Sequence, residues 1–255
     1  MPNLSSSNHF RSAQNLDFCY LCSQPLKGSG APNRDHVPPQ AVFLERDRNP
    51  ALWLPTHTDC NLSQSREDDK IGQLMKLLHR KQPSNPNHRV LKYDYDLGAV
   101  DGIDIERIVF RWVRGFHAAL YGQPLDCRLN GMISTPFVPV DRVDRLPLPV
   151  NKYHALVVRE IKKNRAASCL DSIRSSNGKC RYECVWGKTG DNVWCCLFAL
   201  ELYNWIDLAR SRHSPTRGCC GYYFNSDLAL PPNATVETSV TVPFSNLHQL
   251  DPFGP

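Results

Sequence analysis

Two short pairs of potential metal ligands constrain this chain more than any other feature. The first is the C-x-x-C of Cys19 and Cys22, and the second is the H-x-x-C of His57 and Cys60. Zinc takes four soft or borderline ligands in a tetrahedron, and a spacing of two residues lets one tight turn present two of them. We therefore predict a closed, structural Cys3His zinc site. The alternative is two unrelated surface turns that happen to contain thiols.

The segments beside these pairs carry further signals. Arg34-Asp35-His36-Val37-Pro38-Pro39 lies between the pairs, and Asn61 follows Cys60 directly. A C-x-x-C, an Asp-His-x-x-Pro segment, a strand and a second knuckle that ends in Cys-Asn thus occur in this order. In this respect residues 17 to about 80 resemble the HNH endonuclease family, in its zinc-knuckle branch with a ββα-metal fold.

The resemblance implies a fold, an activity and a set of roles. The fold is α+β, with an N-terminal zinc-stapled ββα-metal (HNH) module followed by a helical and α+β C-terminal region. The activity is hydrolysis of DNA phosphodiester bonds, with DNA as the partner. His36 would be the general base, Asp35 and Asn61 would bind a catalytic Mg²⁺ or Mn²⁺, and Asn49 would tie the loop between the strands. Elementary chemistry agrees, since a neutral imidazole accepts a proton near pH 7 and hard cations prefer oxygen ligands.

Asp35 and His36 are neighbours, which sets a geometric condition. On a regular strand they would point to opposite faces, so both can serve one site only at a strand end or a bulge. Pro38 and Pro39 cannot extend a ladder and so favour a strand end. The alternative for His36 is a hydrogen-bonded structural histidine in a turn.

The second strand and the helix of this module have their own local signals. We predict the strand at 51–55 and a helix that begins near Ser63 or Ser65. Its acidic first turn suits the positive end of the helix dipole. Glu67 is either a further ligand or simply one of these acids, and the second reading is favoured. The expected buried face of the helix is Ile71, Leu74, Met75 and Leu78.

Composition and patterning divide the chain into four parts. These are a flexible N-terminus at 1–16, the HNH module at 17–82, a helical and linker region at 83–150 and an α+β domain of unassigned role at 151–255. Within them we expect a strong helix at 104–122, loop-like structure at 83–103, a helix over KYHALVVREIKKNRA, and a hairpin whose strands are joined by residues 189–192. The last forty residues show little pattern.

Charged and polar residues outside the module leave alternatives open. The net charge of +5 permits a polyanionic partner without requiring one. Two basic sets could contact phosphates, although a solvated face is the commoner explanation. They are Arg107, Arg111 and Arg114 on the first helix, and Arg159, Lys162, Lys163 and Arg165 on the second. His117 lies near an apolar stripe, and we expect a structural role for it.

The eleven cysteines and the absence of an apolar leader or spanning segment favour a soluble chain in a reducing, cytoplasmic setting without membrane contact. Cys180 and Cys184 alternate with aromatic residues, which favours packing over a second zinc site. The main alternative function is a non-catalytic zinc module that binds nucleic acid or protein on the same scaffold. A thiol redox enzyme built on Cys19 and Cys22 is disfavoured, because the strand-to-helix context of such sites is missing.

Overall fold

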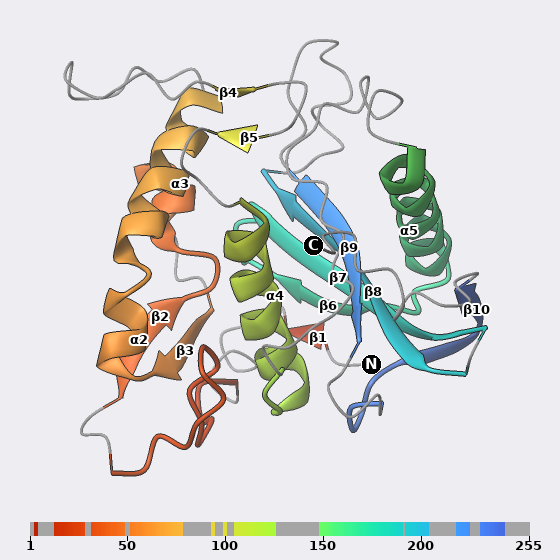
Figure 1. Ribbon diagram of the computed structural model, residues 1–255, viewed down its shortest axis with the longest axis horizontal. Coiled ribbons are helices and arrows are strands. Elements are labelled where there is room, and N and C mark those ends of the chain that lie inside the picture. The colour runs from red at the N-terminus through yellow and green to blue at the C-terminus, as the bar shows by residue number, and fades with distance from the viewer. Residues whose placement is uncertain are drawn as a thin grey trace, which may run out of the picture.

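The computed structural model describes residues 3–4, 13–28, 32–48, 52–78, 93–94, 99–100, 105–125, 148–190, 192–203, 218–224 and 230–242. They form a mixed α+β structure, as predicted. In Figure 1 a small hairpin with its helices lies on one side, helix α4 lies next to it, and a large sheet follows with helix α5 on its far face. Within the described part of the chain, no helix has both the length and the apolar character that crossing a bilayer requires.

The small hairpin pairs β2 (Asn33–His36) with β3 (Trp53–Thr56) in antiparallel register. Two short 3₁₀ segments lie in the connection, η1 (Gln40–Val42) and η2 (Glu45–Asp47). Two helices follow the hairpin, α2 (Thr58–Leu62) and α3 (Ser65–Leu78). The helix start at Ser65 is confirmed, and the second strand is displaced from 51–55 to 53–56. The short helix α2 was not predicted.

The large sheet has six strands, in the order β1-β6-β7-β8-β9, with β10 paired to β7. Their bounds are β1 (Asn3–Leu4), β6 (Asp171–Arg174), β7 (Cys180–Thr189), β8 (Trp194–Leu202), β9 (Gly218–Phe224) and β10 (Val236–Val242). The antiparallel β7–β8 hairpin confirms the prediction. Strand β1 lies in the N-terminal segment that we predicted to be flexible and pairs in parallel with β6. Strands β9 and β10 lie within the last forty residues, whose sequence shows little pattern.

Two long helices flank the sheet. They are α4 (Ile105–Tyr121), which confirms the predicted helix, and α5 (Leu148–Ala166), which begins inside the region read as a linker. The segment read as a loop contains a small pair of strands, β4 (Tyr93–Asp94) and β5 (Ala99–Val100).

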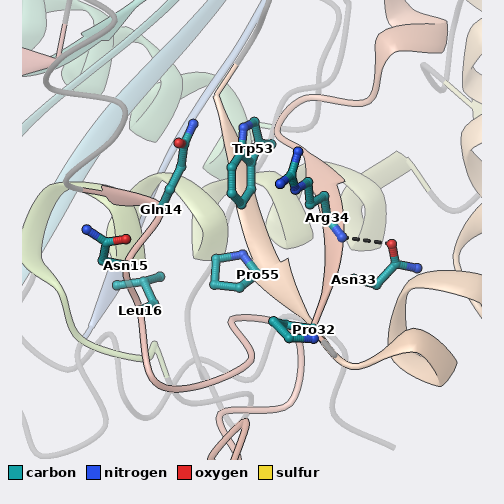
Figure 2. A pocket seen from close by; sticks show the side chains of 8 residues that line it. All are labelled: Gln14, Asn15, Leu16, Pro32, Asn33, Arg34, Trp53 and Pro55. Atoms are coloured by element: carbon teal, nitrogen blue, oxygen red, sulfur yellow. Dashed lines mark hydrogen bonds between the residues drawn. The ribbon is translucent and has the colours of Figure 1, made fainter. Parts of the chain in front are cut away.

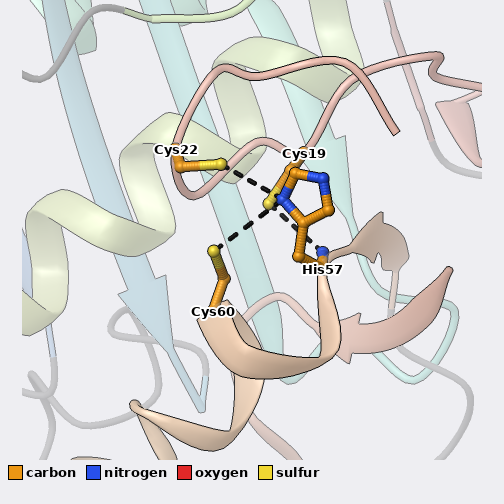
Figure 3. A group of neighbouring side chains, drawn as sticks. All are labelled: Cys19, Cys22, His57 and Cys60. Atoms are coloured by element: carbon orange, nitrogen blue, oxygen red, sulfur yellow. Dashed lines mark hydrogen bonds between the residues drawn. The ribbon is translucent and has the colours of Figure 1, made fainter. Parts of the chain in front are cut away.

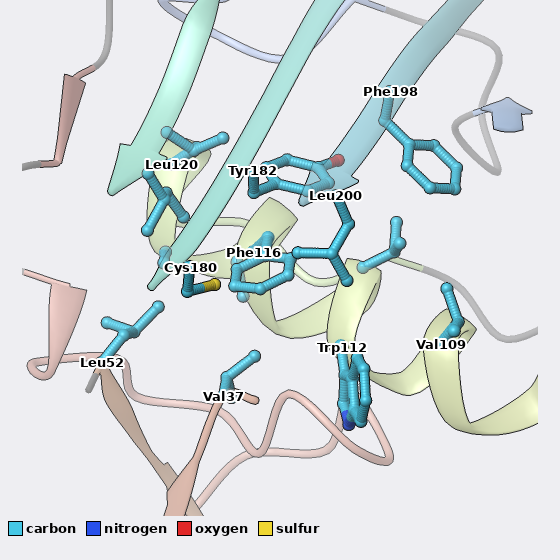
Figure 4. Close-up of a cluster of buried hydrophobic side chains, with 14 of the residues drawn as sticks. Val37, Leu52, Val109, Trp112, Phe116, Leu120, Cys180, Tyr182, Phe198 and Leu200 are labelled. Carbon is cyan, nitrogen blue, oxygen red and sulfur yellow. The ribbon is translucent and has the colours of Figure 1, made fainter. Parts of the chain in front are cut away.

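One hydrophobic core joins the hairpin side to the sheet side through α4. Trp112 and Phe116 of α4 are fully buried, and Phe116 stacks on Tyr182 of β7 with ring centroids 4.5 Å apart. Figure 4 shows Val37 and Leu52 reaching this core from the hairpin side. Residues on both sides of the predicted domain boundaries at 82 and 150 therefore share this core.

Gly115 allows α4 to approach the hairpin closely. A Cβ atom at this position would lie 2.8 Å from Cγ1 of Val37, the residue that follows β2. Because that distance is shorter than real carbon contacts, any side chain here would push the helix and the hairpin apart.

The sheet is buried on both faces. Cys180, Tyr182, Cys184 and Trp186 pack in the core shared with α4, as their alternation predicted. Val185 belongs to a second buried cluster with Val157 and Ile161 of α5 on the other face. A strand covered on both sides needs apolar residues at nearly every position, so its sequence resembles a continuous apolar run.

Candidate metal centre and adjoining polar site

The four predicted zinc ligands come together from two segments (Figure 3). Cys19 and Cys22 lie in a tight loop closed by an isolated bridge between Phe18 and Pro25. His57 immediately precedes α2, whose first turn places Cys60 beside it. Both pairs thus sit in single turns, as their spacing predicts.

The distances suit one tetrahedral ion. All four ligand atoms lie within 4.8 Å of one another. His57 Nδ1 is 3.3 Å from Cys22 Sγ and 3.9 Å from Cys60 Sγ. A tetrahedral zinc with Zn–S bonds of about 2.3 Å separates its sulfur ligands by about 3.8 Å. The cluster can therefore hold zinc with little rearrangement, as a closed four-ligand site that leaves no open position for chemistry.

The histidine ring is oriented for metal binding. His57 Nε2 lies 3.2 Å from the carbonyl oxygen of Pro25. Since a carbonyl only accepts, Nε2 carries the proton and Nδ1 presents its lone pair to the three thiols. This is the usual outer hydrogen bond of a metal-binding histidine.

The three thiols affect one another's protonation. Burial and the neighbouring thiols raise the pKa of Cys60, and burial raises that of Cys19. Burial also acts on Cys22, but its interactions with the Gln24 backbone and with His57 lower its pKa overall. Three thiolates in so small a space require a cation to offset their repulsion.

A second metal site among the other cysteines is not found in the described ranges. No other group of three Cys, His, Asp or Glu side chains there could hold an ion. Cys180, Cys184, Cys195, Cys196, Cys219 and Cys220 are buried and form no disulfide bond.

Asp35 points into the protein. Its side chain is 5% exposed, and the Tyr20 hydroxyl donates a hydrogen bond of 2.5 Å to its Oδ2. Burial raises the pKa of Asp35, while the Tyr20 hydrogen bond and the positive charge of Arg111 act in the opposite direction. The carboxylate already has polar and charged neighbours within the fold.

Arg111 belongs to the same buried group. It pairs closely with Asp68 of α3 and is only 6% exposed. Burial raises the pKa of Asp68 to about 6, against the lowering effect of Arg111. Arg114 is also buried and donates to the carbonyl of Leu125. A solvated face is therefore wrong for Arg111 and Arg114, and neither guanidinium is available to phosphates.

The remaining basic side chains are more exposed. Arg107 forms an exposed ion pair of 3.7 Å with Glu67, which agrees with Glu67 as a first-turn acid of α3. Arg159 and Lys163 lie near Glu160 on the exposed face of α5. Arg165 instead contacts the buried Glu183 and Glu201 of the sheet.

His36 ends strand β2, as the two prolines predicted. Its Nε2 lies 3.1 Å from the Gln40 amide nitrogen, which only donates, so Nε2 is the acceptor. Burial lowers the pKa of His36 below its ordinary 6.5, although Asp35 opposes this. The ring is therefore neutral at pH 7 and carries its lone pair on Nε2.

Asn61 lies beside the same strand. Its Nδ2 donates a 3.1 Å hydrogen bond to the carbonyl of Arg34, the residue before Asp35. Within the described residues, no hydrogen bond or ion pair joins the side chains of Asp35, His36 and Asn61. Asn49 lies outside the described residues.

His117 is fully buried and bonded through Nδ1 to the Tyr223 hydroxyl at 3.0 Å, as expected of a structural histidine. Sequence reasoning missed Tyr20 and Asp68 as neighbours of the polar site. The only available signal was the position of Tyr20 inside the first ligand pair.

Comparison of the chain with family models, with curated proteins and with solved structures finds no match.

Proposed function

We propose that this chain is an HNH-type endonuclease that hydrolyses DNA phosphodiester bonds. The observation that carries the proposal is the hydrogen bond from Asn61 to the carbonyl of Arg34. It ties the residue after the last zinc ligand to the strand that bears Asp35 and His36. The order of motifs in the sequence and the β2–β3–helix arrangement support the same reading.

His36 is the general base of this proposal. Its ring is neutral at pH 7, and Nε2 is the nitrogen with the free lone pair. The Gln40 amide holds that nitrogen in the free protein, and a water molecule replaces the amide when substrate binds. His36 then takes the proton of this water as its oxygen attacks phosphorus.

Asp35 and Asn61 would hold the Mg²⁺ or Mn²⁺ ion. Because the regular strand turns Asp35 inward and His36 outward, this role requires the end of β2 to rearrange when the ion binds. Tyr20 donates to Oδ2 of Asp35, and the carboxyl also accepts a hydrogen bond from the His36 backbone, while Asn61 uses its Nδ2 as a donor. The proposed ligand atoms are a carboxylate oxygen of Asp35 and the amide oxygen of Asn61. These two oxygens fit a hard cation that keeps several waters. When bound, such an ion neutralises charge on the phosphate and lowers the pKa of a bound water.

One observation favours the second candidate, a non-catalytic zinc module that binds nucleic acid or protein. Asp35 is almost completely buried, with Tyr20 bonded to it and Arg111 nearby. A carboxylate with these neighbours is stable without a metal ion. In this reading Asp35 helps to attach the hairpin to α4.

Incubation of supercoiled plasmid with the zinc-loaded protein and Mg²⁺ or Mn²⁺ separates the two candidates. The nuclease nicks or linearises the plasmid, and His36→Ala abolishes cleavage at unchanged zinc content. Glu45→Ala, an exposed change on the same connection, serves as the control and should cut like the wild type. Cleavage by His36→Ala at the wild-type rate contradicts His36 as the base. A wild-type protein that binds DNA but never cuts it supports the zinc module.

A further inference from the structure

A pocket lies against the face of the β2–β3 hairpin that carries Arg34 and Trp53. Its volume is about 540 Å³, within the range of small-molecule sites. Three kinds of side chain line it: amides, a cation stacked on an indole, and apolar groups. They are Gln14, Asn15, Leu16, Pro32, Asn33, Arg34, Trp53 and Pro55.

Arg34 is a cation available to an anion. Its guanidinium carbon lies 4.5 Å from the centre of the Trp53 ring, and the residue is exposed. No carboxylate in the described part of the chain pairs with it. Stacking on the indole holds the guanidinium in place while its N–H groups stay free for the oxygens of a phosphate.

The strand register places this pocket beside His36. Trp53 is the cross-strand partner of His36, and Pro55 is that of Arg34. Side chains alternate along a strand, so Arg34 and His36 share a face. The intervening Asp35 is buried on the opposite face. A ligand held by Arg34 and Trp53 would thus lie on the side of the hairpin where the proposed base is found.

Amide groups complete the lining. Figure 2 shows Trp53 standing between the Gln14 side chain and the Arg34 guanidinium. The amides of Gln14 and Asn15 have no hydrogen-bond partner among the described residues. Each offers a donor and an acceptor, which is what the edge of a nucleobase requires.

We infer that this pocket binds one unpaired nucleotide of a DNA strand. The base stacks on the face of Trp53 that Arg34 does not cover, the amides of Gln14 and Asn15 contact its edge, and Arg34 binds its phosphate. The ring faces of paired bases are covered by their neighbours, so only an unpaired or flipped nucleotide can reach the indole. The choice of DNA rests on the proposed function; the nucleotide chemistry rests on the pocket itself.

The test is fluorescence anisotropy with a fluorescein-labelled 12-nucleotide single strand and its blunt duplex, without added Mg²⁺ or Mn²⁺. Wild type should bind the single strand more tightly than the duplex. Trp53→Leu and Arg34→Gln should each weaken that binding about tenfold, in line with the loss of one stacked base or one phosphate contact. Unlabelled deoxyadenosine monophosphate should compete only weakly.

Trp194→Leu is the matched control. Trp194 is also half-buried and has a cation, Lys188, 4.7 Å from its ring centre, but it lies on β8 of the large sheet. The Trp194→Leu variant should bind the single strand like the wild type. Zinc content and circular dichroism check the fold of each variant, and Trp53→Phe retains a stacking ring and should restore much of the affinity.

Three results overturn the inference. The Trp53→Leu and Arg34→Gln proteins bind the single strand like wild type, or Trp194→Leu loses as much affinity for the single strand as they do. The third is competition by deoxyadenosine monophosphate as strong as that by unlabelled 12-nucleotide strand. These outcomes are separate from plasmid cleavage. A protein that cuts plasmid with unaffected binding in both variants keeps the proposed function and loses the pocket. A protein that never cuts plasmid, yet loses single-strand binding in both variants, keeps the pocket and loses the proposed function.

Discussion

The hairpin side and the sheet side of this molecule are held together differently. Strands β2 and β3 have four residues each, whereas β7 has ten and β8 has nine. An isolated two-stranded hairpin is marginal in water. The sheet is covered by α4 on one face and α5 on the other. The hairpin contributes fewer residues to the core and has the four-ligand cluster next to it. The residues of the proposed active site thus lie on the side that contains the candidate zinc cluster.

The largest expected effect follows from removing a zinc ligand. Cys60→Ser should lose stoichiometric zinc and the protection of β2 and β3, because structural zinc contributes on the order of 10 kcal/mol to small domains. Hydrogen exchange followed by mass spectrometry should show this loss while β7 and β8 stay protected. Cys169→Ser, a half-buried cysteine outside the cluster, is the control. Equal loss of protection in both regions would show that the contrast between them is false.

The converse change is made in the sheet. Phe198 of β8 is fully buried and stacks near Tyr182 and Tyr223. Phe198→Ala should lower the free energy of unfolding by about 3–5 kcal/mol through the cavity it leaves. Urea denaturation measures this, and Phe198→Leu should cost less. Zinc content should stay at one ion per chain; zinc loss in the folded Phe198→Ala protein would argue against separate modes of stabilisation.

A smaller effect concerns the pH dependence of the helix over the sheet. Burial lowers the pKa of His117 to about 3, compared with an ordinary 6.5 in the unfolded chain. Below pH 6.5 the unfolded state binds a proton that the native state does not. The free energy of unfolding therefore falls as pH drops from 6.5 toward 3, by about 2 kcal/mol at pH 5.

His117→Gln removes this titration and keeps an amide near the Tyr223 hydroxyl. The variant should be less stable than wild type at pH 7 but should lose about 2 kcal/mol less between pH 7 and pH 5. Urea denaturation of both proteins at the two pH values gives the comparison, since protonation of the zinc ligands affects both alike. Parallel losses would rule out His117 as the titrating group.

Local patterns predicted local structure well. The two ligand pairs sit in single turns, and α4 and the β7–β8 hairpin follow from periodicity within one segment. The strand β9 was missed because its sequence, GCCGYYF, is packed on both faces and shows no alternation. β1 is only two residues long and exists through its partner β6.

The site was predictable only in its parts. Asp35, His36 and Asn61 were identified from short motifs, but the orientation of Asp35 depends on Tyr20 and on Arg111, which lies far along the chain. Arg111 was read as a surface residue, because a charged residue on a helix usually is one, and its burial against Asp68 depends on how α3 packs with α4. The pocket beside Trp53 combines residues from three separate segments and has no motif of its own.

The position of His57 directly after β3 has a consequence for how the protein is assembled. A slip of one residue between β2 and β3 would turn Asp35 outward and His36 inward, since side chains alternate along a strand. A zinc ion bound by the four candidate ligands would hold residue 57 against the loop at 19–22 and so select one of these alignments. Zinc present during refolding should therefore give a uniform preparation, whereas zinc added afterwards must first undo misaligned strands.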